Sequence, residues 1–328
     1  MLKTTKQGLY CEAGGFHVDP WRPVDRALIT HGHSDHARSG VGHYLTASPG
    51  VPILRSRLGR NISIEGMPHG ETRDINGVKV SFHPAGHVLG SSQIRLEYKG
   101  EVWVVSGDYK LEDDGISGAY EPVKCHTFIT ESTFGLPVYK WQPQRIVAGE
   151  INHWWRNNIE NERASVLFAY SLGKAQRILS LVDSGLGPIF VHGSVAKMNA
   201  AYAESGVVLP ETCDASGKPE KKEAARSLVV APASVDGTPW LAKFGSCSTA
   251  FASGWMRVRG GRRRGNLDRG FVISDHVDWP GLLQAIEASS ADRVLVTHGY
   301  SDAVVRYLNE KGRDAGGLET QFAGETGD

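Results

Sequence analysis

The sequence lacks paired cysteines, a signal segment and any long apolar run. Its 328 residues include four cysteines that are far apart and form no CxxC pair: Cys11, Cys125, Cys213 and Cys247. Thiols spaced in this way favour free cysteines in a reducing cytosol over a disulfide framework. No run approaches the ~18 apolar residues that are needed to span a bilayer, and the first residues hold no apolar signal core. We therefore expect a cytoplasmic protein with no membrane contact.

A net charge is also absent, because 36 Lys and Arg residues balance 36 Asp and Glu residues. Without a global positive field, any site for a polyanion such as nucleic acid must be local. The length suggests about two domains, with enough buried surface to fold unaided.

Four metal-competent side chains fall within six residues after a short apolar segment. Residues 31–36 read His-x-His-x-Asp-His, and residues 26–30 have the pattern of a buried strand. Imidazole and carboxylate groups are the usual ligands of ions such as zinc, and a loop after a strand can direct them inward. The alternative is a polar surface loop that is rich in histidine by chance. The interleaved aspartate and the preceding strand favour metal ligands.

Other candidate ligands follow other expected strands. They divide into two sets of three and one shared group: His31, His33 and His87 for one ion, Asp35, His36 and His298 for a second, and Asp108 between them. Three protein ligands leave a coordination position open, which is typical of a catalytic site where water is activated. The pattern predicts a dinuclear hydrolase, and paired ions suit attack on a phosphodiester.

A separate histidine could protonate the leaving oxygen. His276 lies outside both ligand sets, at an expected strand end, and we expect Glu131 to orient it as a general acid. Asp275 or Asp278 could equally be its partner, and a lone histidine is more often a surface or satisfied residue. Asp35 is counted as a catalytic candidate as well as a ligand.

The expected order of helices and strands changes along the chain. Over 10–95, short apolar runs between turns predict a mostly antiparallel sheet without a long helix, and 51–54 is expected to be a strand. After about residue 140, alternating helices and strands predict a parallel, doubly wound α/β sheet. Strand-then-loop order returns near 269, and the tail beyond 312 is expected to fray.

These motifs, in this order, resemble the metallo-β-lactamase superfamily and, within it, the β-CASP nucleases. The histidine-rich segment resembles the family's second motif, His87 in Pro-Ala-Gly-His-Val-Leu-Gly the third, and Asp108 in Ser-Gly-Asp-Tyr the fourth. Glu131 in Thr-Glu-Ser-Thr-Phe-Gly, His276 in Ser-Asp-His-Val-Asp and His298 in Val-Thr-His-Gly resemble β-CASP motifs A, B and C. The resemblance covers nearly the whole chain.

The resemblance implies an α/β fold in which a metallo-β-lactamase αββα sandwich is interrupted by an α/β β-CASP cap. The sandwich would comprise 1–140 and 269–328, and the cap 141–268. The implied cofactors are two divalent ions, with zinc expected first and manganese second.

Two basic segments are expected to contact nucleic acid. Lys174 and Arg177, in Gly-Lys-Ala-Gln-Arg at a helix start, resemble a cap element that could hold a backbone phosphate. A glycine-interleaved segment supplies the others: Arg257, Arg259, Arg262, Arg263 and Arg264. An ordinary helix start and a solvated loop are the alternatives.

The closest family resemblance, carried by 170–177 and 191–193, is to bacterial DNA-ligase-associated exonucleases. It implies DNA cleavage in end processing or repair and association with a DNA ligase. His298 at motif C is typical of the RNA-cleaving branch, so an endo- or exoribonuclease is the alternative. A silent nucleic-acid-binding scaffold is disfavoured by the intact ligands. A small-molecule hydrolase of the lactamase or glyoxalase II type is disfavoured by the cap and by motifs A, B and C.

Overall fold

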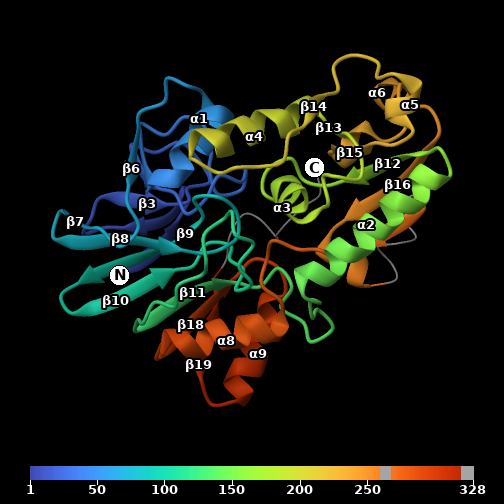
Figure 1. Ribbon diagram of the computed structural model, residues 1–328. Helices are drawn as coiled ribbons and strands as arrows, with labels where there is room; N and C mark the ends of the chain where they lie inside the picture. Colours follow the sequence, from blue (N-terminus) through green and yellow to red (C-terminus); the bar gives the residue numbers. More distant parts are fainter. Residues whose placement is uncertain (259–266, 319–328) are drawn as a thin grey trace. The chain divides into compact units, whose positions relative to one another are not determined.

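The computed structural model describes residues 1–258 and 267–318, which divide into two compact units. The first unit contains Met1–Pro137 and the described residues from Asp275 onward, and the second contains the described residues of Val138–Ser274. Figure 1 shows the helices and strands of both units.

The first unit is built on two mixed sheets. One has the strand order β1 (Leu2–Thr5), β2 (Gly8–Cys11), β3 (Phe16–Val18), β4 (Arg26–Leu28), β5 (His43–Ala47) and β6 (Ile64–Met67). The other has the order β19 (Asp314–Gly317), β18 (Arg293–Thr297), β11 (Thr127–Glu131), β10 (Glu101–Val105), β9 (Ser92–Tyr98), β8 (Val78–Pro84) and β7 (Thr72–Ile75). The pairs from β3 to β6 and from β10 to β19 are parallel, and the remaining pairs are antiparallel.

Alternating side chains on these strands create four layers. Leu28 and Val105 point into a core shared by the two sheets, whereas their neighbours Ala27 and Val104 face outward. Helix α1 (Val51–Leu58) covers the outer face of the first sheet, and helices α8 (Trp279–Ser289) and α9 (Ser301–Glu310) cover that of the second. The predicted αββα sandwich is confirmed.

Three local expectations for this unit are wrong. Residues 51–54 begin helix α1 instead of forming a strand, because proline fits the first turn of a helix, where its missing N–H group has no partner to lose. The sheets are mixed instead of mostly antiparallel. The chain beyond residue 312 still forms β19, which pairs in parallel with β18.

The second unit has one entirely parallel sheet. Its strand order is β14 (Cys213–Asp214), β13 (Ile189–Val191), β15 (Leu228–Ala231), β12 (Ala164–Phe168), β16 (Cys247–Ala252) and β17 (Arg269–Phe271). One face packs on α2 (Gln144–Glu160), α3 (Lys174–Leu181) and α4 (Gly193–Glu204), and the other on α5 (Lys221–Ala224) and α6 (Pro239–Ala242). The predicted doubly wound α/β arrangement is therefore present.

The second unit extends to Ser274 because β17 pairs with β16. Its assignment as a β-CASP cap with bounds at 141 and 268 stays a prediction. Across the described residues, no helix combines the length and apolar character that crossing a bilayer requires.

Candidate metal centre

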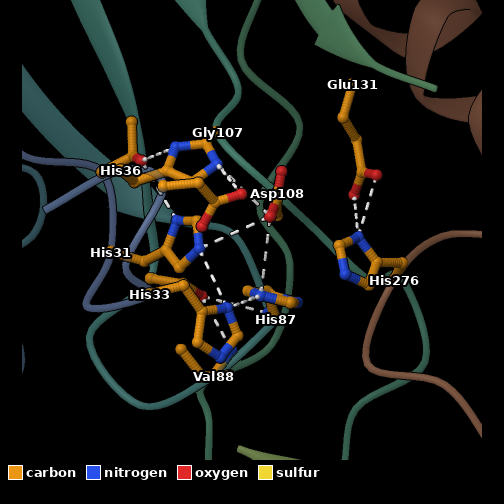
Figure 2. A network of polar contacts seen from close by, with 12 residues as sticks. His31, His33, His36, His87, Val88, Gly107, Asp108, Glu131 and His276 are labelled. Carbon is orange, nitrogen blue, oxygen red and sulfur yellow. Dashed lines mark hydrogen bonds and ion pairs between the residues drawn. The ribbon is translucent and has the colours of Figure 1, made fainter. Parts of the chain in front are cut away.

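The candidate ligands lie where strands of the first unit end. The histidine-rich loop follows β4, His87 follows β8, Asp108 follows β10, and His298 follows β18. Residues up to 267 positions apart in the sequence thus form one cluster of candidate ligands. Figure 2 shows its imidazoles gathered around Asp108.

The first ligand set brings together His31, His33, His87 and Asp108, each with one ligand atom within 4.8 Å of the others. Nδ1 of His33 lies 3.2 Å from Nε2 of His31 and 3.0 Å from Nε2 of His87. Oδ2 of Asp108 lies 3.4 Å and 3.8 Å from the same two Nε2 atoms. A tetrahedral zinc ion with bonds of ~2.05 Å would space its ligand atoms by about 3.3 Å, so this set fits such an ion.

The second ligand set contains Asp35, His36 and His298, again with one ligand atom of each within 4.8 Å of the others. Nε2 of His36 lies 3.7 Å from Oδ2 of Asp35 and 3.5 Å from Oδ2 of Asp108. The same Asp108 oxygen therefore faces both sets. This His36 nitrogen is buried and has no hydrogen-bond partner among the described residues, as expected of an atom that can accept a cation.

Oxygen atoms behind the imidazoles fix which nitrogen faces the cluster. Nδ1 of His36 lies 2.7 Å from Oδ2 of Asp19, and Nδ1 of His87 lies 2.9 Å from the main-chain carbonyl oxygen of Asp275. Such partners orient metal-binding histidines and make the other nitrogen more basic. Asp19 was missed in the sequence, where Asp19-Pro20 indicates only a turn.

Burial and charge shift the pKa values of the ligands in opposite directions. Burial lowers the pKa of His87 to about 3, and it lowers those of His31 and His298 as well. Burial would also lower the pKa of His36, but the carboxylates of Asp108, Asp35 and Asp19 raise it well above its usual value. Most of the imidazoles are thus held neutral, which is the form that binds metal.

Close backbone approach places two of the strand ends. Gly107 has φ of 57°, and a Cβ atom there would lie 2.6 Å from Cβ of Thr30. Gly299 has φ of 68°, and a Cβ atom would lie 2.3 Å from the carbonyl oxygen of Ser132. The Ser132 hydroxyl also donates to the carbonyl of His298, which itself has φ of 54°. Only glycine fits where these segments cross.

A buried histidine and glutamate pair adjoins the first ligand set. Nδ1 of His276 lies 3.0 Å and 2.9 Å from the two carboxylate oxygens of Glu131, which also accept N–H bonds from Tyr109 and Thr133. The His276 ring centroid lies 4.6 Å from that of His87. Burial raises the pKa of Glu131, although His276 opposes this. Figure 2 shows the pair beside the cluster.

The structure places the carboxylate of Glu131 on Nδ1 of His276, whereas that of Asp278 has another contact and that of Asp275 has an oxygen within 4.8 Å of a ring nitrogen of His276. Asp278 caps α8 by accepting the N–H group of Gly281, and the main chain of Asp275 holds His87.

The residues of the second unit that are expected to contact nucleic acid differ in their exposure to solvent. Lys174 and Arg177 begin α3 but are buried, with exposed fractions of 1% and 0%, and Arg177 donates to Gln144. Arg257 is exposed. The other four arginines lie outside the described residues: Arg259, Arg262, Arg263 and Arg264. Contact of these seven residues with nucleic acid stays a prediction.

No family model matches the chain. It is 29% identical over 311 residues to a probable DNA ligase of Opitutus terrae, covering 94% of this chain and 30% of that protein. It is 32% identical to endoribonuclease ysh-1 of Neurospora crassa, covering 43% of this chain and 16% of the relative. An RNase J-like protein of Methanocaldococcus jannaschii is 28% identical, covering 55% and 50%. The chain thus spans half or less of the length of each of these relatives.

A crystal structure of a protein of unknown function from Enterococcus faecalis has the same fold, with a TM-score of 0.58 and 13% identity over 92% of this chain and 80% of that one. The resemblance of the chain to the β-CASP nucleases of the metallo-β-lactamase superfamily, which its motifs indicated, is confirmed by these relatives.

Proposed function

We propose that the chain is a metal-dependent nuclease that hydrolyses phosphodiester bonds, acting as a DNA exonuclease in end processing or repair. One observation carries the proposal: two adjacent ligand sets face the same Asp108 oxygen, and a buried histidine paired with a carboxylate lies beside them. Similarity to relatives that are named as nucleases supports the same reaction class.

The residues that would hold the ions are the two ligand sets, with Asp108 shared. Zinc is the first candidate because imidazoles predominate among the ligands, and manganese is the second. Bound there, two divalent ions would supply an activated water and would stabilise negative charge on the phosphoryl oxygens.

His276 would donate the proton that the leaving oxygen requires. Because Glu131 occupies Nδ1, the proton to be transferred is the one on Nε2. The carboxylate favours the charged imidazolium and fixes the ring, which are the two requirements for a general acid. Asp35 would contribute through the ion that it helps to hold.

DNA is favoured over RNA by the extent of similarity. The relative named as a DNA ligase matches 94% of this chain, whereas the matches to the Neurospora crassa and Yarrowia lipolytica endoribonucleases cover 43% and 49% of it. Because the match covers 30% of the ligase-named relative, we also propose that this chain works with a DNA ligase. The alternative is an RNA-processing enzyme, favoured by His298 at motif C and by the endoribonuclease names.

Cleavage of matched oligonucleotides tests the proposal. The purified protein, loaded with zinc or manganese, is given DNA and RNA strands of one sequence, labelled at either end, and a circular single-stranded DNA. Stepwise shortening of DNA from one end is expected, with none in an Asp108→Asn variant. Cleavage of RNA alone would refute the choice of DNA, and cutting of the circle would refute exonuclease action. An inactive but metal-loaded protein would refute the nuclease itself.

A further inference from the structure

One segment of the first unit has basic residues and no acidic ones. Between Asp35 and Glu65 the chain contains no Asp or Glu, and it contains four arginines: Arg38, Arg55, Arg57 and Arg60. Helix α1 lies in this segment, and its buried side chains pack on the outer face of the first sheet. Arg55 and Arg60 are exposed. We name these two residues the α1 basic surface.

The α1 basic surface, like the exposed Arg22 and Arg26, has no ion pair among the described residues, and in this it differs from the arginines around the second sheet. Arginines in the strands and helices of the second sheet have carboxylate partners: Arg73 with Glu65, Arg95 with Glu97, Arg293 with Asp314, Arg306 with Glu310 and Arg313 with Glu287. Even Arg306, whose side chain is 83% exposed, is paired. Arg55 and Arg60 form no ion pair with any residue of 1–258 or 267–318. Their charge is therefore not offset locally.

Helix α1 is joined directly to the first metal-binding loop. The guanidinium of Arg57 donates a hydrogen bond to the carbonyl of Gly32, which lies between two candidate ligands. Leu54 packs in the same cluster as Ala37, at the end of that loop. Arg55 therefore lies in the helix that supports the ligand loop, and Arg60 follows shortly after the end of that helix.

A solvated face that aids solubility is the simpler interpretation of exposed arginines. It does not account for the lack of acidic residues over the segment, since soluble surfaces usually mix both signs. A polyanion that approaches the ligand loop would meet uncompensated guanidinium groups there.

We propose that Arg55 and Arg60 bind the phosphodiester backbone of the nucleic acid beside the cleavage site, and so position the strand. This inference rests on the proposed function and adds a contact surface on the unit that holds the ligands. Guanidinium groups bind phosphates without reading sequence, so the surface would act on DNA and RNA alike.

The test compares an Arg55→Ala/Arg60→Ala double variant with wild type and with Arg306→Ala, the matched exposed arginine. Binding of fluorescent single-stranded DNA or RNA is measured by anisotropy in chelator, which prevents cleavage. Each lost phosphate contact lowers the slope of log affinity against log salt by about 0.7. Raising salt from about 50 to about 200 mM should then cost the double variant about sevenfold less affinity than it costs wild type. Arg306→Ala should match wild type.

Turnover of long and short substrates separates this surface from the reaction. For an oligonucleotide, KM of the double variant should rise while kcat is kept. For bis(p-nitrophenyl) phosphate, which is too small to reach α1, both constants should be unchanged. An unaltered salt slope and KM would overturn the inference while leaving the nuclease intact. Wild type that neither binds nor cleaves nucleic acid would instead overturn the proposed function. Loss of small-substrate turnover would show that the arginines support the ligand loop and do not bind the strand.

Discussion

Replacing Asp19 by asparagine should weaken the second metal site while leaving the first intact. The Asp19 carboxylate accepts the Thr30 N–H group at 2.8 Å and the Thr30 hydroxyl at 2.5 Å, and it lies 2.7 Å from Nδ1 of His36. Asparagine has the same shape and tolerates the φ of 43° at this position. The substitution therefore removes the charge and one acceptor without forcing the backbone to move.

The expected loss follows from the role of this carboxylate. With aspartate, Nδ1 of His36 can donate a proton to the carboxylate, and Nε2 faces the cluster as an acceptor. An amide NH₂ group facing Nδ1 would favour the opposite tautomer and leave a hydrogen on Nε2. Loss of such a partner costs about 10–100-fold in metal affinity, or about 1.4–2.7 kcal/mol. Only the second ion should be affected.

The assay is a competition titration of the metal-free protein with zinc and a chromophoric chelator, together with a count of bound ions after dialysis. Wild type should retain two ions, and the Asp19→Asn variant should retain one tightly bound ion. Asp25→Asn, an exposed change six residues away, is the control and should behave as wild type. Two equally tight ions in the Asp19→Asn variant would refute the idea that Asp19 sets the tautomer of His36.

Three further predictions test other parts of the structure. A His276→Asn variant should keep its two ions but lose about 10²–10⁴-fold in kcat on an oligonucleotide. The exposed His153→Asn change is the control and should have no effect. Equal kcat values for wild type and His276→Asn would show that His276 does not act in the reaction. A Ser132→Ala variant loses the hydrogen bond to the carbonyl of His298, which is worth about 1 kcal/mol. Affinity for the second ion should therefore fall about fivefold in the same titration, whereas the exposed Ser39→Ala change is the control and should have no effect. Unchanged affinity in Ser132→Ala would mean that the close approach of the backbone segments alone holds His298. Burial raises the pKa of the Cys125 thiol to about 12 from its ordinary value of 9.0, and a pKa raised by folding gives stability that is full below the unfolded value and is lost as pH rises toward the folded one. The free energy of unfolding in urea should therefore fall by up to about 1.4 kcal/mol per pH unit above pH 9, and less steeply in Cys125→Ala; identical slopes would contradict the assignment.

The ligand cluster could be predicted because each ligand directly follows a buried strand. Strand ends at one edge of a sheet lie close together, so sequence position relative to a strand carries spatial information. Helix α1 could not be predicted in this way. Its first residues, Val51-Pro52-Ile53-Leu54, are as apolar and β-branched as a strand, and the position of proline in the first turn distinguishes the two only once the helix is recognised.

Asp19 was missed for a different reason. Its contact with His36 depends on the register of β3 and β4, in which His17 pairs with Ala27 and Val18 with Leu28. That register carries the chain from Val18 toward the segment that follows Leu28, where Asp19 meets Thr30. Both strands lie in the sequence before the ligand loop, but local sequence patterns do not predict which strands pair with each other. Had the parallel pairing been inferred, an acidic residue just past the end of β3 would have been a natural candidate.

The predicted nucleic-acid contacts also depended on a long-range property, namely whether each positive charge has a carboxylate partner. The predicted contact segment 257–264 has a high density of arginine, whereas the arginines of 38–60 are sparser. Density does not measure whether a charge is offset, because the partner of an arginine can be 26 residues away, as Glu287 is from Arg313. Arg55 and Arg60 have no ion pair among the described residues and lie in or just after the helix that contacts the ligand loop, whereas Arg177 is buried and bound to Gln144. The pairing of each cation, more than the number of cations, therefore indicates where a strand of phosphates can bind.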